Sequence, residues 1–238
     1  MALPKLNVPE YTCKLPSSGK SVKFRPFLVK EEKLLYLAME SGEQTDMVNA
    51  IQRIIVECTN LTKVTDLTTF DIEYLFLQIR TRSVGESVEV TVTCPDDGTT
   101  EVKANIDLDL ISVKFDDNHT KELRLTDDLI LTMKYPSMEQ FVKMNFGDDD
   151  NTSMIDQVMD LAKGCADTIT DPNQVYQCKD ATKKELNTFF ENMNSKQFQM
   201  IQNFFETMPK LYHELTVTNP NTGGENKIVL EGLAAFFG

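Results

Sequence analysis

The chain has no tryptophan and only two histidines, His119 and His213, among its 238 residues. General-base catalysis uses histidine more often than any other side chain, and a nucleophile needs a base beside it. His119 lies in Asp-Asn-His-Thr, an expected turn between strands, and His213 lies in an expected strand. Neither accompanies a nucleophile-elbow sequence or a glycosidase-like context. We therefore expect a protein that is not an enzyme.

Phosphate-binding and metal-binding motifs are also lacking. The sequence has neither G-x-x-x-x-G-K-[ST] nor G-x-G-x-x-G. Cys94-Pro-Asp-Asp97 resembles half of a zinc knuckle, but Asp97 stands where the second cysteine would be. Counted from Asp148 as a calcium loop, Ser153 replaces the glycine and Met159 the glutamate. We expect a plain β-turn, a solvated loop, no metal and no cofactor.

Long apolar runs are missing too. No stretch approaches the ~20 apolar residues that span a bilayer, and the first residues lack the apolar region of a secretory signal. The five cysteines are odd in number and scattered in spacing, which is typical of reduced thiols in a core. These features predict synthesis in the cytoplasm and no membrane-spanning segment.

Basic residues are few relative to acidic ones. Lys and Arg number 24 and Asp and Glu 37, which gives a formal net charge of −13. Such a balance repels nucleic acid, whose binding depends on neutralised phosphates, and it repels anionic lipid headgroups. We expect neither as a partner.

The first part of the chain, residues 1–85, combines a hairpin with helices. Strands are expected at 11–15 and 22–27 around a turn at 16–20. A helix follows, with Glu31 and Glu32 in its first turn, where the helix dipole favours acidic groups. Leu34, Leu35, Ala38 and Met39 are expected to form its apolar side. Helices at about 46–58 and 70–82 show apolar residues at helical spacing, and Gly85 ends the second.

Residues 86–136 show a different sequence pattern, in which apolar and polar residues alternate as they do in strands. Val88, Val90 and Val92 predict a strand, and residues 95–98 predict a turn to a partner strand at 102–108. Further strands are expected at 111–115, 121–125 and 129–135. This β-rich block, an antiparallel hairpin and meander, is either an insertion or a small lobe.

Residues 137–238 form a second helical block that ends in a hairpin. Ser137 with Gln140 and Thr182 with Glu185 fit capping boxes. Helices are expected at 153–169, from 183 and at 195–208, with a short strand at 175–176. The last hairpin turns at 219–224. The chain is thus predicted to be α+β, with two mainly helical blocks flanking the β-rich block and hairpins near both ends.

Phenylalanines crowd the last quarter of the chain. Phe204 and Phe205 are adjacent, so they point about 100° apart on a helix and one narrow apolar stripe cannot bury both. Phe236 and Phe237 stand within the last three residues, where chains are usually polar. We expect one of the first pair, together with the last pair, to contact a partner; a broad buried face is the alternative.

Several strings resemble a known family. They are KLNVPEY at 5–11, FRPFLVKEEK at 24–33, FDIEYLF at 70–76, RSVGE at 82–86, NFFETMPKL at 203–211, LEGL at 230–233 and FFG at 236–238. The chain is similar over essentially its whole length to the T4-type bacteriophage baseplate family, in the group of hub subunits and hub assembly proteins. The resemblance carries no catalytic motif.

The resemblance implies a non-enzymatic role in a contractile phage tail. The chain would act through protein–protein contacts in the central baseplate hub, in the virion, after assembly in the host bacterial cytoplasm. Its partners would be other tail baseplate and hub proteins, and it could form a homo-oligomer there. Two alternatives stay open, namely a transient hub assembly chaperone absent from the mature virion and a tail-associated cell-wall hydrolase.

Overall fold

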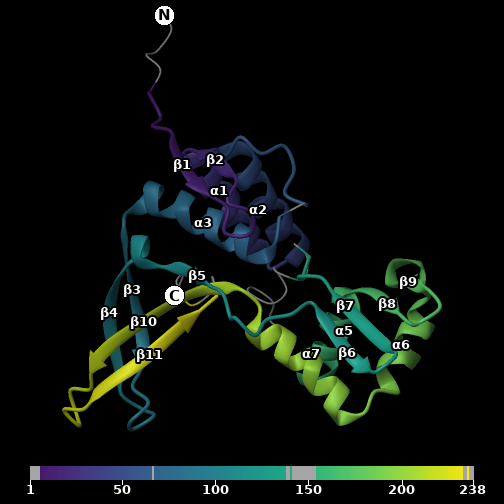
Figure 1. Ribbon diagram of the computed structural model, residues 1–238. Coiled ribbons are helices and arrows are strands. Elements are labelled where there is room, and N and C mark those ends of the chain that lie inside the picture. Colours follow the sequence, from purple (N-terminus) through teal and green to yellow (C-terminus); the bar gives the residue numbers. More distant parts are fainter. Residues whose placement is uncertain (1–5, 66, 138–139, 141–153, 233–234, 236–238) are drawn as a thin grey trace, which may run out of the picture. The chain divides into compact units, whose positions relative to one another are not determined.

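The computed structural model describes residues 6–65, 67–137, 140, 154–232 and 235. Within this part of the chain it contains six helices and eleven strands, and the strands pair antiparallel (Figure 1). The predicted α+β class is confirmed. No helix among the described residues is long and apolar enough to cross a membrane.

The described residues form two compact units. Unit 1 comprises residues 6–114 and 210–235, and unit 2 comprises 115–140 and 154–209. Unit 1 therefore joins segments from both ends of the sequence. The three blocks 1–85, 86–136 and 137–238 describe the order of elements along the sequence, and their division into domains stays a prediction.

Three helices carry the core of unit 1: α1 (Val29–Ser41), α2 (Gln44–Cys58) and α3 (Thr69–Val84). The Thr68 side chain caps α3 by accepting a hydrogen bond from the Asp71 N–H, and Gly85 follows its last turn at φ 139°. Leu75, Leu77 and Ile79 of α3 are fully buried, so this helix is central to the unit. The predicted helices, and Gly85 as the stop signal, are confirmed.

The apolar side predicted for α1 is wrong in one position. Ala38 is buried as expected, but Met39 is 58% exposed. The inward position is taken by Glu31, whose carboxylate accepts hydrogen bonds from the Leu28 N–H and from Arg25, both at 2.8 Å. The buried side of α1 thus contains a charged residue, Glu31, beside Ala38, and Met39 lies on the outer side.

Hairpins make up the rest of unit 1. Strands β1 (Tyr11–Lys14) and β2 (Ser21–Phe24) form the predicted first hairpin, and β3 (Ser87–Thr93) and β4 (Glu101–Asp107) form the second. Strands β10 (Lys210–Thr218) and β11 (Glu225–Glu231) form the predicted last hairpin, and β5 (Ser112–Lys114) pairs with the start of β10.

Two of these hairpins lie together. In Figure 1 the hairpins β3–β4 and β10–β11 run side by side, with their turns pointing away from α1, α2 and α3. We call this pair of hairpins the arm. Its two halves come from sequence positions more than 100 residues apart.

Unit 2 is a four-stranded sheet with helices. The strand order is β6-β7-β8-β9, formed by β6 (Glu122–Thr126), β7 (Leu129–Met133), β8 (Ala166–Thr170) and β9 (Val175–Gln177). The helices are α5 (Met154–Cys165), α6 (Lys183–Glu191) and α7 (Ser195–Thr207). Leu131, Ala162, Cys165, Ile201 and Phe204 form the centre of its apolar core. The strands predicted within 86–136 are thus divided among three sheets.

The helix predicted over 153–169 is too long. Ser153 lies outside the described residues, and α5 ends at Cys165. Ala166–Thr170 continues directly as β8, which pairs with β7 from Ile130↔Thr170 to Met133↔Ala166. Thr168, Ile169 and Thr170 are β-branched and favour a strand, and pairing on both sides of β8 decides against the helix.

Both capping boxes predicted from the sequence are present in the structure. The Thr182 side chain accepts from the Glu185 N–H, and the Glu185 carboxylate accepts from the Thr182 N–H at 2.8 Å, which is the predicted capping box. Ser137 and Gln140 make the same reciprocal pair of hydrogen bonds. Such boxes are recognisable because both partners lie within one helical turn.

Candidate interaction surfaces

His119 is half-buried in unit 2, where it forms a cluster with two aromatic rings. Its ring stacks against Tyr135 at 5.7 Å and lies 5.2 Å from Phe204. Nδ1 is 3.0 Å from the Thr207 hydroxyl, and Nε2 is 3.2 Å from the Tyr135 hydroxyl. Burial, with Lys121 nearby, lowers the pKa of His119, while Asp116 opposes that shift. The ring is held as a structural group that joins α7 to the end of β7.

The hydrogen bonds fix the protonation pattern of this histidine. The Thr207 hydroxyl donates its single proton to the Asn203 carbonyl at 2.7 Å. It can therefore only accept from His119, so Nδ1 carries the proton. Nε2 of the neutral ring then accepts from the Tyr135 hydroxyl. Both ring nitrogens are occupied by protein groups.

The half knuckle at residues 94–97 forms a turn, as the sequence predicts. The Gly98 N–H donates to the Cys94 carbonyl at 3.0 Å, and Gly98 has a φ of 67°, which favours glycine. Within the part of the chain that the structure describes, no group of three or more His, Cys, Asp or Glu side chains could hold a metal ion. His213 lies in β10, as expected.

The cysteines are all free and buried. Burial raises the pKa of Cys13 and of Cys58 to about 11 and that of Cys165 to about 12. A thiol with a raised pKa carries little of the reactive thiolate. These side chains act as small apolar core residues, in the way that their scattered spacing predicts.

The aromatic residues proposed as partner contacts lie in different environments. Phe204 is 1% exposed in the core of unit 2, where it contacts His119 and packs edge-on against Phe205 at 5.2 Å. Phe205 is partly buried against the same core. Phe236 and Phe237 lie outside the described residues. Phe204 and Phe205 thus both lie on a broad apolar face of α7, where Phe204 is fully buried and Phe205 partly buried.

The tip of the arm is held by a polar network. The Asn219 side chain, fully buried, donates to the Asp96 carboxylate at 2.7 Å, and the Thr222 hydroxyl donates to the other oxygen of Asp96 at 2.5 Å. The Asp96 N–H donates to the side-chain oxygen of Asn226 at 3.1 Å. The Asn221 amide donates to the Thr100 hydroxyl at 2.8 Å. Three of these hydrogen bonds join the two turns, and the bond to Asn226 joins the β3–β4 turn to β11.

A second carboxylate stabilises the β3–β4 turn from within. Asp97 accepts hydrogen bonds from the hydroxyl of Thr100 and from the backbone N–H groups of Thr99 and Thr100. These bonds hold the pKa of Asp97 well below its usual range. Hydrogen bonds from Thr222 and Asn219 likewise lower the pKa of Asp96. The sequence identifies both turns, but no local pattern in it predicts the bonds between them.

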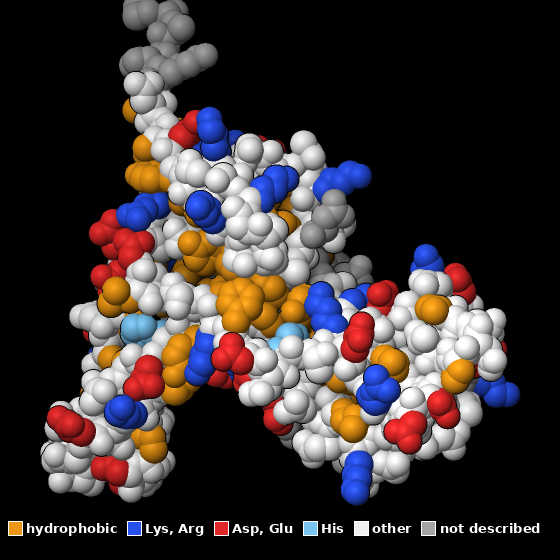
Figure 2. All heavy atoms as spheres, in the orientation of Figure 1, with side chains coloured by type: hydrophobic (Ala, Val, Ile, Leu, Met, Phe, Trp, Pro, Cys, Tyr) orange, Lys and Arg blue, Asp and Glu red, His pale blue; other side chains and the backbone are white. Residues whose placement is uncertain are grey.

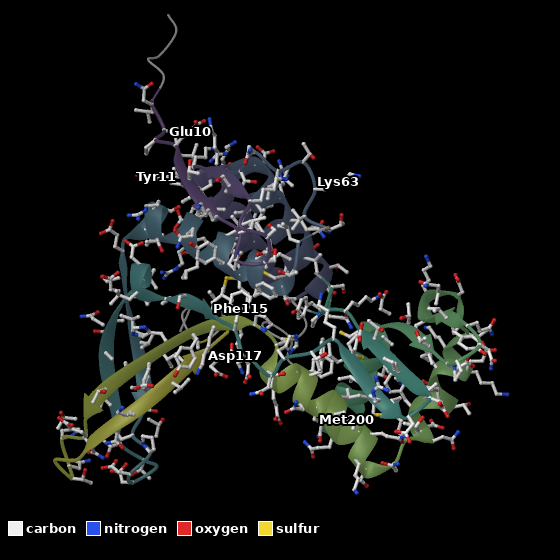
Figure 3. The ribbon with its side chains drawn as sticks, viewed as in Figure 1. Glu10, Tyr11, Lys63, Phe115, Asp117 and Met200 are labelled. Carbon is white, nitrogen blue, oxygen red and sulfur yellow. The ribbon has the colours of Figure 1, made fainter. Side chains whose placement is uncertain are left out.

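Helix α1 has several large apolar side chains exposed on the surface of unit 1. Val29 is 78% exposed, Tyr36 61% and Met39 58%, and their i, i+7, i+10 spacing places them on one face of the helix. We call these three residues the α1 face. In Figure 2 the apolar side chains visible over β9, α6 and α7 of unit 2 lie apart from one another among charged ones, and Met200 lies on α7 (Figure 3).

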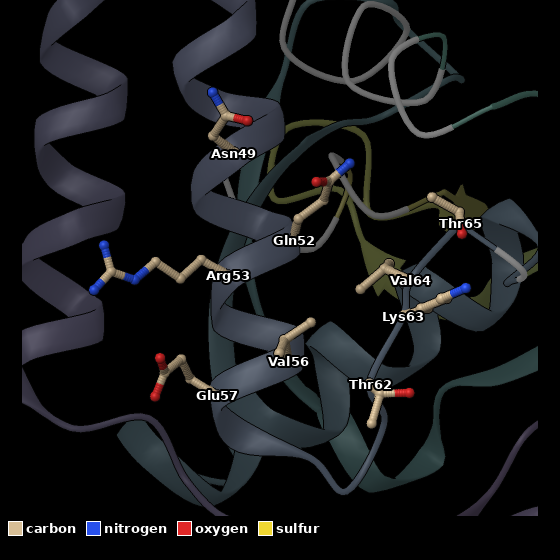
Figure 4. Close-up of a pocket in the computed structure, with 9 residues that line it drawn as sticks. All are labelled: Asn49, Gln52, Arg53, Val56, Glu57, Thr62, Lys63, Val64 and Thr65. Atoms are coloured by element: carbon tan, nitrogen blue, oxygen red, sulfur yellow. The ribbon is translucent and has the colours of Figure 1, made fainter.

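An open groove lies beside α2 in unit 1. It has a volume of about 530 Å³ and runs between α2 and the loop that follows it (Figure 4). Asn49, Gln52, Arg53 and Val56 line it from the helix, and Lys63 from the loop. The lining is mixed in charge and open to solvent, so its geometry indicates no particular ligand.

Comparison with known proteins gives one match. The model of the family described as "T4 bacteriophage base plate protein" matches residues 8–238. No curated protein and no solved structure matches the chain. The family match covers both units and nearly the whole sequence. The chain therefore belongs to the T4 bacteriophage base plate protein family.

Proposed function

We propose that this chain is a non-enzymatic structural or assembly component of the central hub in the baseplate of a contractile-tail phage. The observation that carries the proposal is the family match over residues 8–238. The surroundings of His119 support a non-enzymatic role, because both ring nitrogens bond to protein hydroxyls. The chain would act through contacts with other baseplate proteins in the virion tail.

The α1 face is the proposed contact for another baseplate protein. Only Glu31 and Ala38 of the thirteen residues of α1 are buried, so the helix gains little from packing within unit 1. Large apolar side chains that gather on one exposed face favour association with a partner. The charged side chain of Glu32 lies on the same face, three residues after Val29 and four before Tyr36, and Lys33 lies at its edge. Both would contact polar groups of the partner surface.

The phenylalanines remain a second proposed contact. Phe205 has a partly exposed side chain, whereas Phe204 would act by supporting it from the core. Phe236 and Phe237 complete the proposed set. Deletion of residues 233–238 should weaken partner assembly more than it lowers the melting temperature if the last pair docks on a partner. A large loss of stability with normal assembly would place that pair in the core of this protein instead.

Phage complementation tests the α1 face. Tyr36→Glu together with Met39→Glu should lower the yield of complete tails at least tenfold, with the circular dichroism spectrum and melting temperature unchanged. Leu110→Glu is the matched control, because Leu110 is 66% exposed in unit 1 and lies outside α1. Normal tail yield with the double variant would exclude this face as the contact.

The finer role is tested on purified virions. Mass spectrometry that finds the chain at a fixed ratio to other baseplate proteins would support a permanent hub subunit. Its absence from virions, combined with defective tails when it is missing, would favour a transient assembly chaperone. Clearing of peptidoglycan in a zymogram, lost on His119→Ala or His213→Ala, would instead favour the hydrolase. Normal tails without the chain would refute the proposal.

A further inference from the structure

Strand β11 has one edge that no described residue pairs with. The sheet order is β11-β10-β5, so β11 is an edge strand. At the two ends of the hairpin, the Gly232 N–H donates to the Leu211 carbonyl and the Asn219 N–H donates to the Gly224 carbonyl, each at 2.9 Å. These bonds fix which residues of β11 face β10, because hydrogen-bonded pairs alternate along an antiparallel ladder.

Because of this alternation, the backbone N–H and C=O groups of every second residue of β11 point away from β10. With the observed register, Asn226, Ile228 and Leu230 bond towards β10. The N–H and C=O groups of the intervening residues therefore point away from the sheet. These residues are Glu225, Lys227, Val229 and Glu231, and we call them the outer row. Their side chains share one face and are exposed.

The outer row has a symmetric charge pattern. Lys227 precedes Val229 by two residues, and Glu231 follows it by two. If β11 pairs antiparallel with an identical strand and Val229 opposes Val229, Lys227 of each strand opposes Glu231 of the other. Opposite charges directly across a strand pair stabilise it, and like charges destabilise it.

Other registers are less favourable. Centring the pair on Ile228 opposes Glu225 with Glu231, and centring it on Lys227 opposes two lysines. A pair centred on Asn226 opposes Glu225 with Lys227, but the two strands then overlap over residues 225–227 alone. The register centred on Val229 overlaps over 227–231. It also buries the Val229 side chain, which is 47% exposed in the single chain, against its copy.

We propose that β11 pairs antiparallel with β11 of a second copy of this chain, about a two-fold axis at Val229. The pairing would continue the sheet from β5 and β10 of one copy into β10 and β5 of the other. Within one chain Lys227 lies 3.3 Å from Glu214, and Glu231 lies 2.5 Å from Lys210. Lys227 and Glu231 therefore have different partners within a chain and become each other's partners between chains.

Cross-linking gives a direct test. Antiparallel hydrogen-bonded pairs have Cα atoms about 5.5 Å apart, which suits a disulfide. Val229→Cys should therefore form a disulfide-linked dimer on mild oxidation. The five native cysteines are buried, so the introduced thiol would be the accessible one. Thr216→Cys is the matched control, because in the dimer its two copies would be three strand spacings apart across the sheet and about four residues apart along it. They would be roughly 20 Å apart and unable to bond.

A charge exchange tests the register. By analytical ultracentrifugation, Lys227→Glu should weaken the dimer about tenfold, because two like-charged pairs replace two opposite ones. Combining it with Glu231→Lys should restore dimerisation, although the double variant opposes like charges within each chain. Failure of the double variant to recover would contradict the proposed register.

Proline provides a test that leaves the hairpin intact. The Val229 N–H points outward, so Val229→Pro removes no bond to β10 but blocks an added strand. The variant should be monomeric with an unchanged circular dichroism spectrum. A wild-type chain that stays monomeric at its highest soluble concentration would overturn the proposal, as would equal cross-linking of the Thr216→Cys control. If Val229→Pro instead abolished binding to a different baseplate protein, the edge would belong to that partner.

Discussion

The Asn219 side chain donates a hydrogen bond of 2.7 Å to Asp96, which lies 123 residues earlier in the sequence. The bond closes the arm at its tip, where the turns of two hairpins meet. Asn219 is fully buried, and its side-chain oxygen also accepts from the Asn221 N–H at 2.8 Å. One side chain therefore shapes its own turn and anchors the neighbouring one.

Replacing Asn219 should destabilise the protein. Asn219→Ala removes both hydrogen bonds of a fully buried side chain, so we expect the free energy of unfolding of unit 1 to fall by about 2 kcal/mol. Urea denaturation would measure the loss. Thr99→Ala is the control, because Thr99 contributes to the turn through its backbone N–H. Equal effects from the two variants would contradict the role of the network.

The stability of the arm should depend on Asp97 at acidic pH. Its carboxyl has a pKa below the unfolded value of about 3.9. Its contribution is thus fully present above about pH 5 and is lost as the pH falls. Wild type should be more stable than Asp97→Asn at pH 7, and the difference in urea midpoint should shrink below about pH 4. A difference that grows on acidification would contradict this assignment.

The elements that the sequence predicted have short-range causes. The turn at 95–98 follows from Pro95 and Gly98, and the helix at Thr182 follows from its capping box. The hairpin at 219–224 is marked by its proline and glycines. Each signal needs only residues within one turn of each other, so no knowledge of the rest of the fold is required.

The features that were not predicted from the sequence depend on residues that lie far apart along the chain. β8 is a strand because β7 and β9 pair with it, although Ala166 continues the helical pattern of α5. The hydrogen bond between Asn219 and Asp96 likewise joins residues far apart in the sequence, so no local sequence pattern predicts it. Glu31 is buried although glutamate is almost always exposed unless it is paired, and here Arg25 compensates its charge.

Arg25 and Glu31 should be strongly coupled. Burial disfavours the ionised Glu31, but hydrogen bonds from Arg25, the Leu28 N–H and Lys30 outweigh it and lower its pKa to about 2. Arg25→Met would leave a buried carboxylate without its main partner. We expect a loss of about 3 kcal/mol in the free energy of unfolding.

A double-mutant cycle separates this coupling from lost packing. Arg25→Met combined with Glu31→Met removes both charges and should be more stable than Arg25→Met alone, because no unpaired charge remains. Urea titrations of wild type, both single variants and the double variant supply the four free energies. Additive losses would show that the two side chains act independently.

His119 should titrate below the usual histidine value of about 6.5. Burial and Lys121 lower its pKa, and the hydrogen bonds from the Tyr135 hydroxyl and to Thr207 suit the neutral ring. Because the folded pKa is lower than the unfolded one, stability is fully present above about pH 6.5 and falls as the pH drops towards the folded value. The free energy of unfolding should therefore rise between pH 5 and pH 7 through this residue.

Nitrogen-15 NMR on the His213→Gln variant isolates the His119 signal, since the chain has two histidines. The chemical shifts should identify Nδ1 as the protonated nitrogen of the neutral ring, because Thr207 donates its proton to Asn203 and can only accept. Thr207→Val should remove that preference, whereas Thr188→Val is a control in which a hydroxyl that bonds to its own helix is lost elsewhere in unit 2. A titration midpoint above 6.5, or a ring protonated at Nε2, would contradict the arrangement in which His119 bridges α7 and the end of β7.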